Sequence, residues 1–333
     1  MIHTETKSVP LETIDFSDHT YRISSLADPA WIDALAESID RLGLLQAPLI
    51  LEKKSHRRIV SGFRRIEACH RSGREEIPCR MLGSGTPTRK VVQLAVAENA
   101  WQRPLDLMEK ARAFALLGKI ESNSNQIAEL AVPLGLVENP KMIDKLIRLT
   151  RLPVPIQQAV ETGSLGLAMA LTLGTLETEE GRQILELFQT FHFGLNRQRE
   201  LLELIREIAK RESIPIGQVL ASDEIIAIMN RTDQDRPARG GTLRLYLKKR
   251  RYPTLTEMET EFTRLERKLG LGPRVRMVPP PYFEGNTYQL ILAFDTLEEL
   301  SGHQEHLNKL RRHPRLKVFL ERKASGTRMG HKA

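Results

Sequence analysis

Hydrophobic and polar positions follow two different patterns along this chain. Near the N-terminus, short β-branched runs such as Ile59–Val60 lie between helical patterns over 29–42 and 62–72, the second of which ends at Gly73. From about residue 104 to 230, apolar residues recur at helical spacing. The pattern therefore predicts a small α/β domain followed by a long helical region.

The C-terminal part returns to a mixed pattern. Strand-like runs at 274–278 and 288–294 precede a helical pattern over 296–311, and the run at 315–321 predicts a further strand. The Pro- and Gly-containing segment 236–241 predicts a flexible break. The chain is thus expected to be an α+β multidomain protein. The predicted parts are an α/β domain (1–103), a helical domain (104–235), a basic linker and helix (236–270) and a small C-terminal α/β domain (271–333).

Composition narrows the class of protein. The 333 residues suit two or three domains, and a net charge of +8 with a pI near 9.5 favours a polyanionic partner. Two cysteines, Cys69 and Cys79, exclude a disulfide framework and a zinc ribbon and favour a cytoplasmic location. No apolar run approaches the roughly 18–20 residues that span a bilayer, so we expect no membrane association.

Residues 58–71 carry the strongest candidate chemistry. The β-branched run meets a small-residue turn, Ser61–Gly62, and a helix opens at once with Arg64 and Arg65. Such a corner presents backbone N–H groups and the positive end of a helix dipole, a combination that binds phosphate. Arginines in a first turn oppose that dipole. A bound anion explains them better than the alternative, an ordinary basic turn.

Residues 125–153 predict a helix-turn-helix. Gly135 supplies the turn, and the second helix opens at Asn139 with a proline after it. The inner stripe runs from Met142 to Leu149, and two packed bundle helices are the alternative interpretation. In such a motif the second helix enters the major groove of DNA. The predicted DNA-binding residues of this helix are Asn139, Lys141, Asp144, Lys145 and Arg148.

A second basic feature is the run of four cations beside Tyr252. It could bind phosphates without reading sequence, or it could simply be solvated. The predicted contacts are Lys248, Lys249, Arg250 and Arg251.

The order of motifs in the first half of the chain resembles the ParB family of chromosome and plasmid partition proteins. The four matching pieces are Arg22 after the first strand, the segment 38–48, the glycine–arginine turn, and the pair Glu98–Asn99 ahead of a helix that carries Glu109. Four pieces in the right order over about 90 residues carry the resemblance, which fades after residue 175.

The resemblance implies a ParB/sulfiredoxin-like N-terminal domain that binds CTP and Mg²⁺, and a DNA clamp that acts in partition. It also implies a homodimer joined through the C-terminal domain, double-stranded DNA and a ParA-type ATPase as partners, and a place on the nucleoid or a plasmid. The implied nucleotide-binding residues are Arg22, Ser38, Gly62, Arg64, Arg65, Glu98 and Asn99, with Glu98 and Asn99 near the metal.

Several departures from the family pattern change what is expected. Phe63 stands where the family has a glutamate, and Gln102 stands where it has an arginine, with Arg103 one position on. Phenylalanine cannot act as a general base, so we expect at most weak CTP hydrolysis and assign no catalytic residue. The segment 166–169 lacks the family's His and Arg, which argues against the usual partition site as the target. The alternative function is a helix-turn-helix regulator that has lost the nucleotide switch.

An enzyme on the same scaffold is the remaining alternative. Sulfiredoxin shares the small fold, but its reactive cysteine would fall at Phe63, and Cys69 lies inside the helix, away from the dipole that would activate a thiol. A kinase or a thiol-linked reductase would need a nucleophile or base beside Gly62. Only Ser61 is present there.

Overall fold

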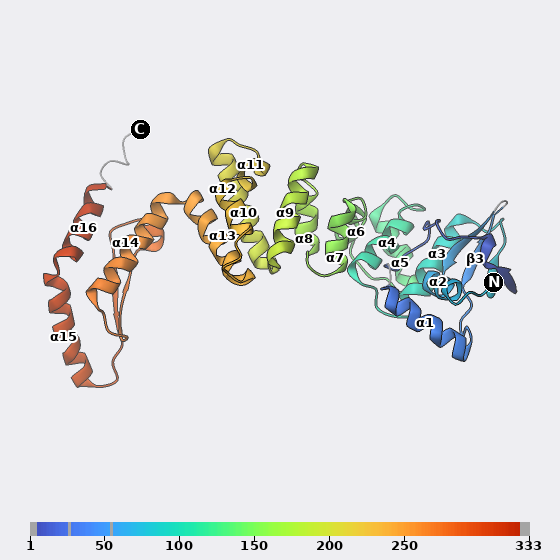
Figure 1. Ribbon diagram of the computed structural model, residues 1–333, viewed down its shortest axis with the longest axis horizontal. Helices are drawn as coiled ribbons and strands as arrows, with labels where there is room; N and C mark the ends of the chain where they lie inside the picture. The colour runs from blue at the N-terminus through green and yellow to red at the C-terminus, as the bar shows by residue number, and fades with distance from the viewer. Residues whose placement is uncertain (1–4, 26–27, 54–55, 327–333) are drawn as a thin grey trace. The chain divides into compact units, whose positions relative to one another are not determined.

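The computed structural model describes residues 5–25, 28–53 and 56–326. The chain is mixed α/β and mostly helical (Figure 1). It divides into two compact units, Met1–Arg199 and Glu200–Ala333, and the boundary falls within helix α10 (Leu195–Glu212). The domain limits expected at residues 103 and 235 stay predictions. Within the described ranges, no helix has both the length and the apolar character that crossing a bilayer requires.

The first unit begins with a five-stranded mixed sheet of order β1-β5-β3-β4-β2. The pairs β1/β5 and β3/β4 are antiparallel, whereas β3/β5 and β2/β4 are parallel. The register sets Ser61 opposite Leu49, which brings the end of β4 to the start of β3. The strands are β1 (Glu5–Pro10), β2 (Ile14–Asp15), β3 (Leu49–Glu52), β4 (Arg57–Ser61) and β5 (Glu76–Leu82).

Helices α1 (Pro29–Leu42) and α2 (Phe63–Arg71) pack against each other and share one core with the sheet. The Asp28 side chain accepts a hydrogen bond from the Ala30 N–H and caps α1, and Pro29 follows in the first turn. Both helices predicted in this region are confirmed. Their buried faces meet the sheet through Ile32, Ile39, Ile50, Ile59 and Ile66.

The rest of the first unit is helical. Helix α4 starts at a capping box, in which the Asp106 side chain accepts from the Glu109 N–H and the Glu109 side chain accepts from the Asp106 N–H. Helix α4 packs on α6, and α6 packs on α5. The helices are α3 (Thr88–Ala100), α4 (Leu107–Leu117), α5 (Ser124–Ala131), α6 (Pro140–Leu149), α7 (Val154–Glu161), α8 (Leu167–Leu173) and α9 (Thr178–Phe191).

In the second unit, the flexible break predicted at 236–241 is wrong. Those residues form the first turns of helix α13 (Arg236–Arg251). The Asp235 side chain caps the helix by accepting from the Ala238 N–H at 2.8 Å, and the proline sits in the first turn, where its missing N–H costs nothing. Gly240 is buried and so serves packing rather than flexibility. Helices α11 (Ile216–Leu220) and α12 (Asp223–Met229) precede it.

The C-terminal part of this unit combines a two-stranded antiparallel sheet with three helices. The predicted strand at 315–321 is wrong, because residues 314–326 form a helix. Leu316 and Phe319 stand three apart, at helical spacing, and pack together against Phe262 and its neighbours. The elements are α14 (Pro253–Leu269), β6 (Val275–Val278), β7 (Gln289–Leu292), α15 (Leu297–Arg312) and α16 (Pro314–Gly326).

Candidate anion site and nucleic-acid interface

Gly62 makes the corner between β4 and α2. Its φ of 87° and ψ of 22° lie in the left-handed region, and a Cβ there would come within 2.9 Å of the Pro48 Cβ. Only glycine fits both demands. Gly62 has no side chain with which to cap α2, so within the described structure the first N–H groups of the helix remain available to a ligand.

Arg65 is bonded within the protein. Its Nη1 donates to the Gln46 carbonyl at 2.6 Å, and its Nη2 lies 3.3 Å from Glu98 Oε1. Arg80 Nη2 lies 3.2 Å from the same oxygen, and Ser61 Oγ donates to Glu98 Oε2. We call Gly62, Arg64 and Arg65 the arginine turn. A bound anion is not needed to explain Arg65, because Glu98, 37 residues beyond Ser61, supplies the negative charge.

Arg64 points to a different neighbourhood. Its Nη2 donates to the Ser25 carbonyl at 3.2 Å and lies 4.0 Å from Glu109 Oε1, and its guanidinium sits 5.3 Å from the centre of the Trp31 ring. Its Nε is buried and has no hydrogen-bond partner among the described residues. A buried, charged donor left in this state is costly unless a ligand satisfies it.

Arg22 is the second arginine with an unsatisfied donor. Its Nε donates to the Ser24 carbonyl at 3.3 Å, and its guanidinium lies 5.4 Å from the centre of the Phe63 ring. Its Nη2 is buried and, within the described part of the chain, has no partner. Burial lowers the pKa of Arg22, and the like charges of Arg64 and Arg112 act in the same direction. The cationic forms of this group would gain from a nearby anion.

Arg112, which the sequence analysis missed, completes this group. Its Nη1 donates to Ser25 Oγ at 3.1 Å, and its Nη2 pairs with Glu161. Ser25 Oγ in turn donates to Glu161 Oε1 at 3.0 Å. We call Arg22, Arg64 and Arg112 the arginine cluster. Arg112 lies on a helix 48 residues beyond Arg64, and no local sequence pattern predicts that the two arginines lie in the same group.

Among the described residues, two predicted nucleotide-site side chains form no hydrogen bond with Gly62, Arg64 or Arg65. Ser38 lies half-buried on α1, and its side chain forms no hydrogen bond among the described residues. The Asn99 amide donates from Nδ2 to the Ala95 carbonyl of its own helix at 2.8 Å. The structure thus brings together Gly62, Arg64, Arg65, Glu98 and Arg22, while the roles of Ser38 and Asn99 stay predictions.

The residues around the turn do not fit a Mg²⁺ ion. Mg²⁺ needs a near-octahedral set of oxygen ligands. Both oxygens of Glu98 are already bonded to Arg65, Arg80 and Ser61. Asn99 donates from Nδ2 to its own helix and could offer only its single amide oxygen, which is far short of an octahedral set. No metal-dependent step is therefore assigned to this site.

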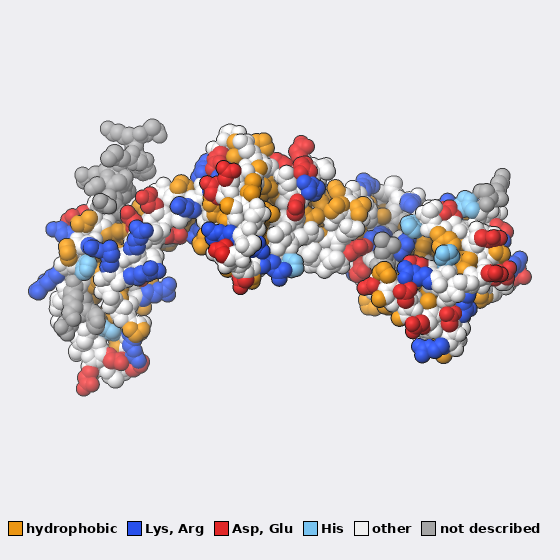
Figure 2. Space-filling model, viewed as in Figure 1, with side chains coloured by type: hydrophobic (Ala, Val, Ile, Leu, Met, Phe, Trp, Pro, Cys, Tyr) orange, Lys and Arg blue, Asp and Glu red, His pale blue; other side chains and the backbone are white. Residues whose placement is uncertain are grey.

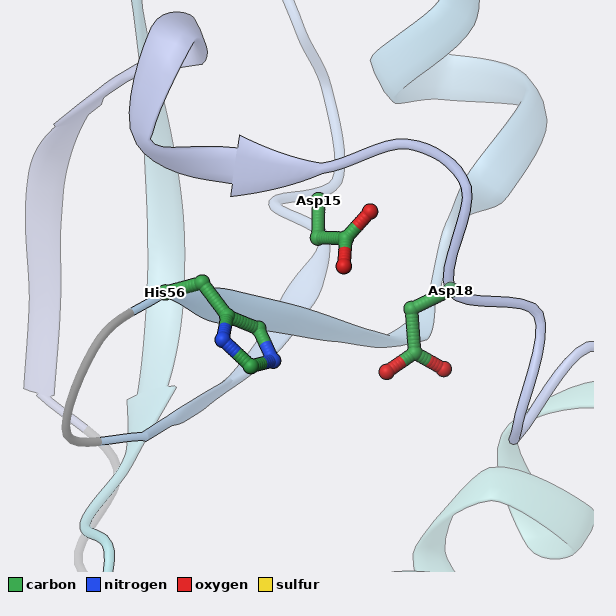
Figure 3. Close-up of side chains that lie close together, drawn as sticks. All are labelled: Asp15, Asp18 and His56. Carbon is green, nitrogen blue, oxygen red and sulfur yellow. The ribbon is translucent and has the colours of Figure 1, made fainter.

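Among the described residues, one other group could hold a metal ion by its geometry. Asp15 on β2, Asp18 in the loop after it and His56 directly before β4 converge with ligand atoms within 4.8 Å of one another (Figure 3). Both carboxylates already have structural roles. Asp15 accepts from the N–H and hydroxyl of Ser17, and Asp18 accepts from the Thr20 N–H and pairs with Arg58.

Thiol chemistry is disfavoured by the same structure. Cys69 and Cys79 are both buried in the core. Burial raises the pKa of Cys69, and burial raises the pKa of Cys79 to about 12. Phe63, at the position of the sulfiredoxin cysteine, is 8% exposed and belongs to the same core. Neither thiol would be an accessible thiolate at neutral pH.

Helices α5 and α6 form the pair predicted between 125 and 153. Gly135 turns with a φ of 86°, covered by the Trp101 ring, and Asn139 caps α6 by accepting from the Met142 N–H at 2.9 Å. The inner positions Ile143, Leu146 and Leu149 are buried. Asp144 is exposed and accepts from Ser124 Oγ, which ties it to the start of α5. The exposed cations of this face are Lys141, Lys145 and Arg148, which form no ion pair with a described residue.

The basic run at the end of α13 is mostly neutralised. Three of its four cations pair with acidic residues of the second unit, and only Lys249 is exposed without an ion pair to the described residues. The pairs are Lys248 with Glu259 at 3.1 Å, Arg250 with Glu212 at 2.6 Å and Arg251 with Glu207 at 2.6 Å. Phosphate binding by this run stays a prediction.

Comparison with known proteins identifies relatives along much of the chain. Residues 2–100 match the ParB N-terminal domain family. A protein named "Probable chromosome 1-partitioning protein ParB" from Deinococcus radiodurans is 28% identical over 209 residues, which cover 63% of this chain and 68% of that protein. The nucleoid occlusion protein of Listeria innocua is 27% identical over 203 residues, which cover 59% and 69%.

A solved structure also aligns with part of the chain. It is the C-terminally truncated chromosome-partitioning protein ParB from Caulobacter crescentus, complexed with CTP-γ-S. The alignment covers 54% of this chain and 98% of that chain, at 21% identity and a TM-score of 0.27.

Proposed function

The chain is a member of the ParB family, and on that premise we propose that it is a partition protein that binds double-stranded DNA and responds to a cytidine nucleotide. The observation that carries the nucleotide part is the pair of buried, unsatisfied donors, Arg22 Nη2 and Arg64 Nε, beside the uncapped start of α2. A phosphate group accepts such charge-assisted hydrogen bonds and also the helix N–H groups.

The proposed role of the nucleotide is binding rather than turnover. Phe63 offers neither a proton acceptor nor a hydrogen bond to orient water. Glu98, the nearest carboxylate of the turn, is occupied by Arg65, Arg80 and Ser61. We therefore expect the nucleotide to act as a switch ligand whose release, not its hydrolysis, resets the protein.

The proposed DNA-binding surface is the outer face of α6. Lys141, Lys145 and Arg148 share this exposed face, and the buried stripe of the helix fixes its orientation on α4 and α5. A recognition helix reads base edges and phosphates with such side chains. The target is proposed to differ from the family's usual partition site, because Gly166–Met169 at the start of α8 carries neither His nor Arg.

We propose that the C-terminal part joins two copies of the chain. Large apolar side chains are exposed on β7, in the segment that follows it, and on α15 and α16. Figure 2 shows hydrophobic side chains among Lys and Arg side chains on the surface of the protein. An exposed apolar surface of this kind favours association. A clamp would follow if nucleotide binding brought two N-terminal domains together while this contact held the dimer. The exposed side chains include Ile291, Phe294, Leu297, Leu300, Leu307, Val318 and Leu320.

Calorimetric titration of the full-length protein with CTP, CDP, ATP and GTP tests the nucleotide part. We expect heat of binding with CTP and weaker or no heat with the purine nucleotides. If no nucleotide binds, the alternative of a regulator without a switch becomes the better account.

Fluorescence anisotropy with an operator selected from random DNA tests the DNA part. Changing Lys141 and Lys145 together to Ala should weaken specific binding by at least about thirtyfold, because each good base contact is worth about 1–3 kcal/mol. Glu129, also exposed, provides a matched control on the neighbouring helix α5, where Glu129→Ala should leave affinity unchanged. Full affinity in the double variant would show that another surface reads the DNA.

A further inference from the structure

Each carboxylate around the arginine cluster is already held by an arginine. The pairs are Glu98 with Arg65 and Arg80, Glu109 with Arg103, Glu161 with Arg112, and Glu67 with Arg71. A carboxylate bonded in this way must give up those contacts before it can coordinate a metal ion. The site therefore presents cations to a ligand and no ready set of metal ligands.

Two guanidinium groups are in excess after these pairs are made. Arg22 forms no ion pair with a described residue, and Arg64 lies 4.0 Å from Glu109, a carboxylate that Arg103 already binds at 2.5 Å. Both carry a buried donor without a partner in the described structure. The unpaired positive charge is thus concentrated on Arg22 and Arg64.

Phe63 explains why Arg22 remains unpaired. Its ring is buried in the core, and the Arg22 guanidinium packs on it at 5.4 Å. An aromatic face attracts the cation without neutralising its charge or accepting its N–H donors. A carboxylate at the same position would take those hydrogen bonds and cancel the charge.

We propose that this site binds a polyphosphate group directly, without a divalent cation, and that Phe63 is the positioning residue that makes this possible. The inference rests on the proposed nucleotide-binding function and deepens it. Arg22 and Arg64 supply the positive charge that Mg²⁺ would otherwise supply to the phosphates. Glu98 serves as the internal counter-ion of Arg65 and Arg80 rather than as a metal ligand.

The first test is calorimetric titration of the full-length wild-type protein with inorganic tripolyphosphate and with CTP, each in EDTA and in excess Mg²⁺. We expect both ligands to bind in EDTA, with affinities within about threefold of those in Mg²⁺. Binding that requires Mg²⁺ would overturn this inference and leave the proposed nucleotide function in place. Absence of binding under both conditions would overturn both.

Glu98→Gln gives a test in which the two possible roles of Glu98 predict different changes in affinity. If Glu98 neutralises Arg65 and Arg80, the nearly isosteric amide releases their charge, and tripolyphosphate affinity in EDTA should rise by about tenfold. If Glu98 is a metal ligand, the variant should leave binding in EDTA unchanged and weaken it in Mg²⁺. The second pattern would contradict the proposal.

A comparison of Phe63→Glu with Phe63→Gln isolates the charge at position 63. Both variants remove the ring and place a polar group of similar size in the core, and thermal unfolding checks that both fold. We expect Phe63→Glu to bind tripolyphosphate in EDTA at least about tenfold more weakly than Phe63→Gln. Equal affinities would remove the role assigned to Phe63. The wild-type titration in EDTA decides the metal question even if neither variant folds.

Discussion

The two main basic features of this chain differ in whether their positive charges are neutralised within the protein. In the run Lys248–Arg251, three of four cations pair with glutamates of the same unit, and the Arg211 side chain covers the carbonyls of Arg250 and Arg251. In the arginine cluster of the first unit, Arg22 and Arg64 keep buried donors without partners in the described structure. The four consecutive cations Lys248–Arg251 thus mostly form ion pairs within the fold, whereas arginines that are far apart in the sequence form the candidate site.

The difference depends on which carboxylates lie near each set of cations and on the sign of the helix dipole there. The run ends helix α13, where cations suit the negative end of the dipole and meet glutamates from α10 and α14. The arginine cluster lies at the start of α2, where the dipole has the opposite sign and Phe63 stands in place of an acidic residue. Unsatisfied buried charge, rather than the local density of cations, marks the site that favours an anion.

The largest effect on stability should come from removing the charge of a buried carboxylate that pairs with an arginine. Glu109 is 1% exposed and bonded by both nitrogens of Arg103. Glu109→Gln should lower the free energy of unfolding of the first unit by about 2–3 kcal/mol, because it removes charge-assisted hydrogen bonds to a buried carboxylate. The 45% exposure of the Arg103 side chain keeps the loss below that of a fully buried pair. Glu212→Gln in the basic run should cost less than about 1 kcal/mol. Urea unfolding followed by the fluorescence of Trp31 and Trp101, which both lie in the first unit, measures the first effect; circular dichroism measures the second.

The same carboxylate gives a signed pH dependence. Burial alone would raise the pKa of Glu109, but the hydrogen bonds from Arg103 and the Asp106 N–H, with the charge of Arg64, outweigh it and lower the pKa. A depressed folded-state pKa contributes stability that is present above the ordinary value of 4.5 and is lost as pH falls through the folded value. Wild-type stability should fall below pH 4.5 more steeply than that of Glu109→Gln. Parallel curves would contradict this assignment.

The next largest effect should distinguish Arg22, which has an unsatisfied donor, from Arg65 in the turn, which is already bonded. Arg22→Ala should weaken tripolyphosphate binding by roughly ten- to a hundredfold, the loss typical of a charge-assisted phosphate contact of about 1.5–3 kcal/mol. Arg65→Ala should have a smaller effect, because the guanidinium of Arg65 already donates to the Gln46 carbonyl and pairs with Glu98. Calorimetry on the two variants decides the order. A larger loss in Arg65→Ala would mean that the ligand displaces Glu98 and binds on that side of the turn.

The smallest effect is expected from the basic run. Lys249 is its one exposed cation without a described ion pair, so Lys249→Ala should change DNA affinity only a few-fold and reduce the salt slope by about one. Anisotropy measured over a series of salt concentrations gives both quantities. A loss as large as that of the Lys141/Lys145 double variant would show that the run binds DNA in spite of its ion pairs.

The sequence predicted the local parts of this fold well. Strand, turn and helix around Gly62, the Asn139 cap and the exposed face of α6 all depend on residues close to one another in the chain. The partners of the arginines did not follow from any pattern, because Glu98, Glu109 and Glu161 reach them through tertiary packing. For the same reason the helices at 236–251 and 314–326 were missed. Pro and Gly residues in the first, and the alternating Leu316, Val318 and Leu320 in the second, predicted other structures, but the helix cap and side-chain packing determine the fold there.

The most direct test of the account compares the two basic regions in one titration. Tripolyphosphate is titrated into the wild-type protein, the Arg22→Ala/Arg64→Ala variant and the Arg250→Ala/Arg251→Ala variant, with circular dichroism as a control for folding. The account predicts that the first variant loses binding while the second binds as the wild type does. Retained binding in the first variant together with a loss in the second would contradict the central claim that unsatisfied buried charge, not cation density, makes the anion site.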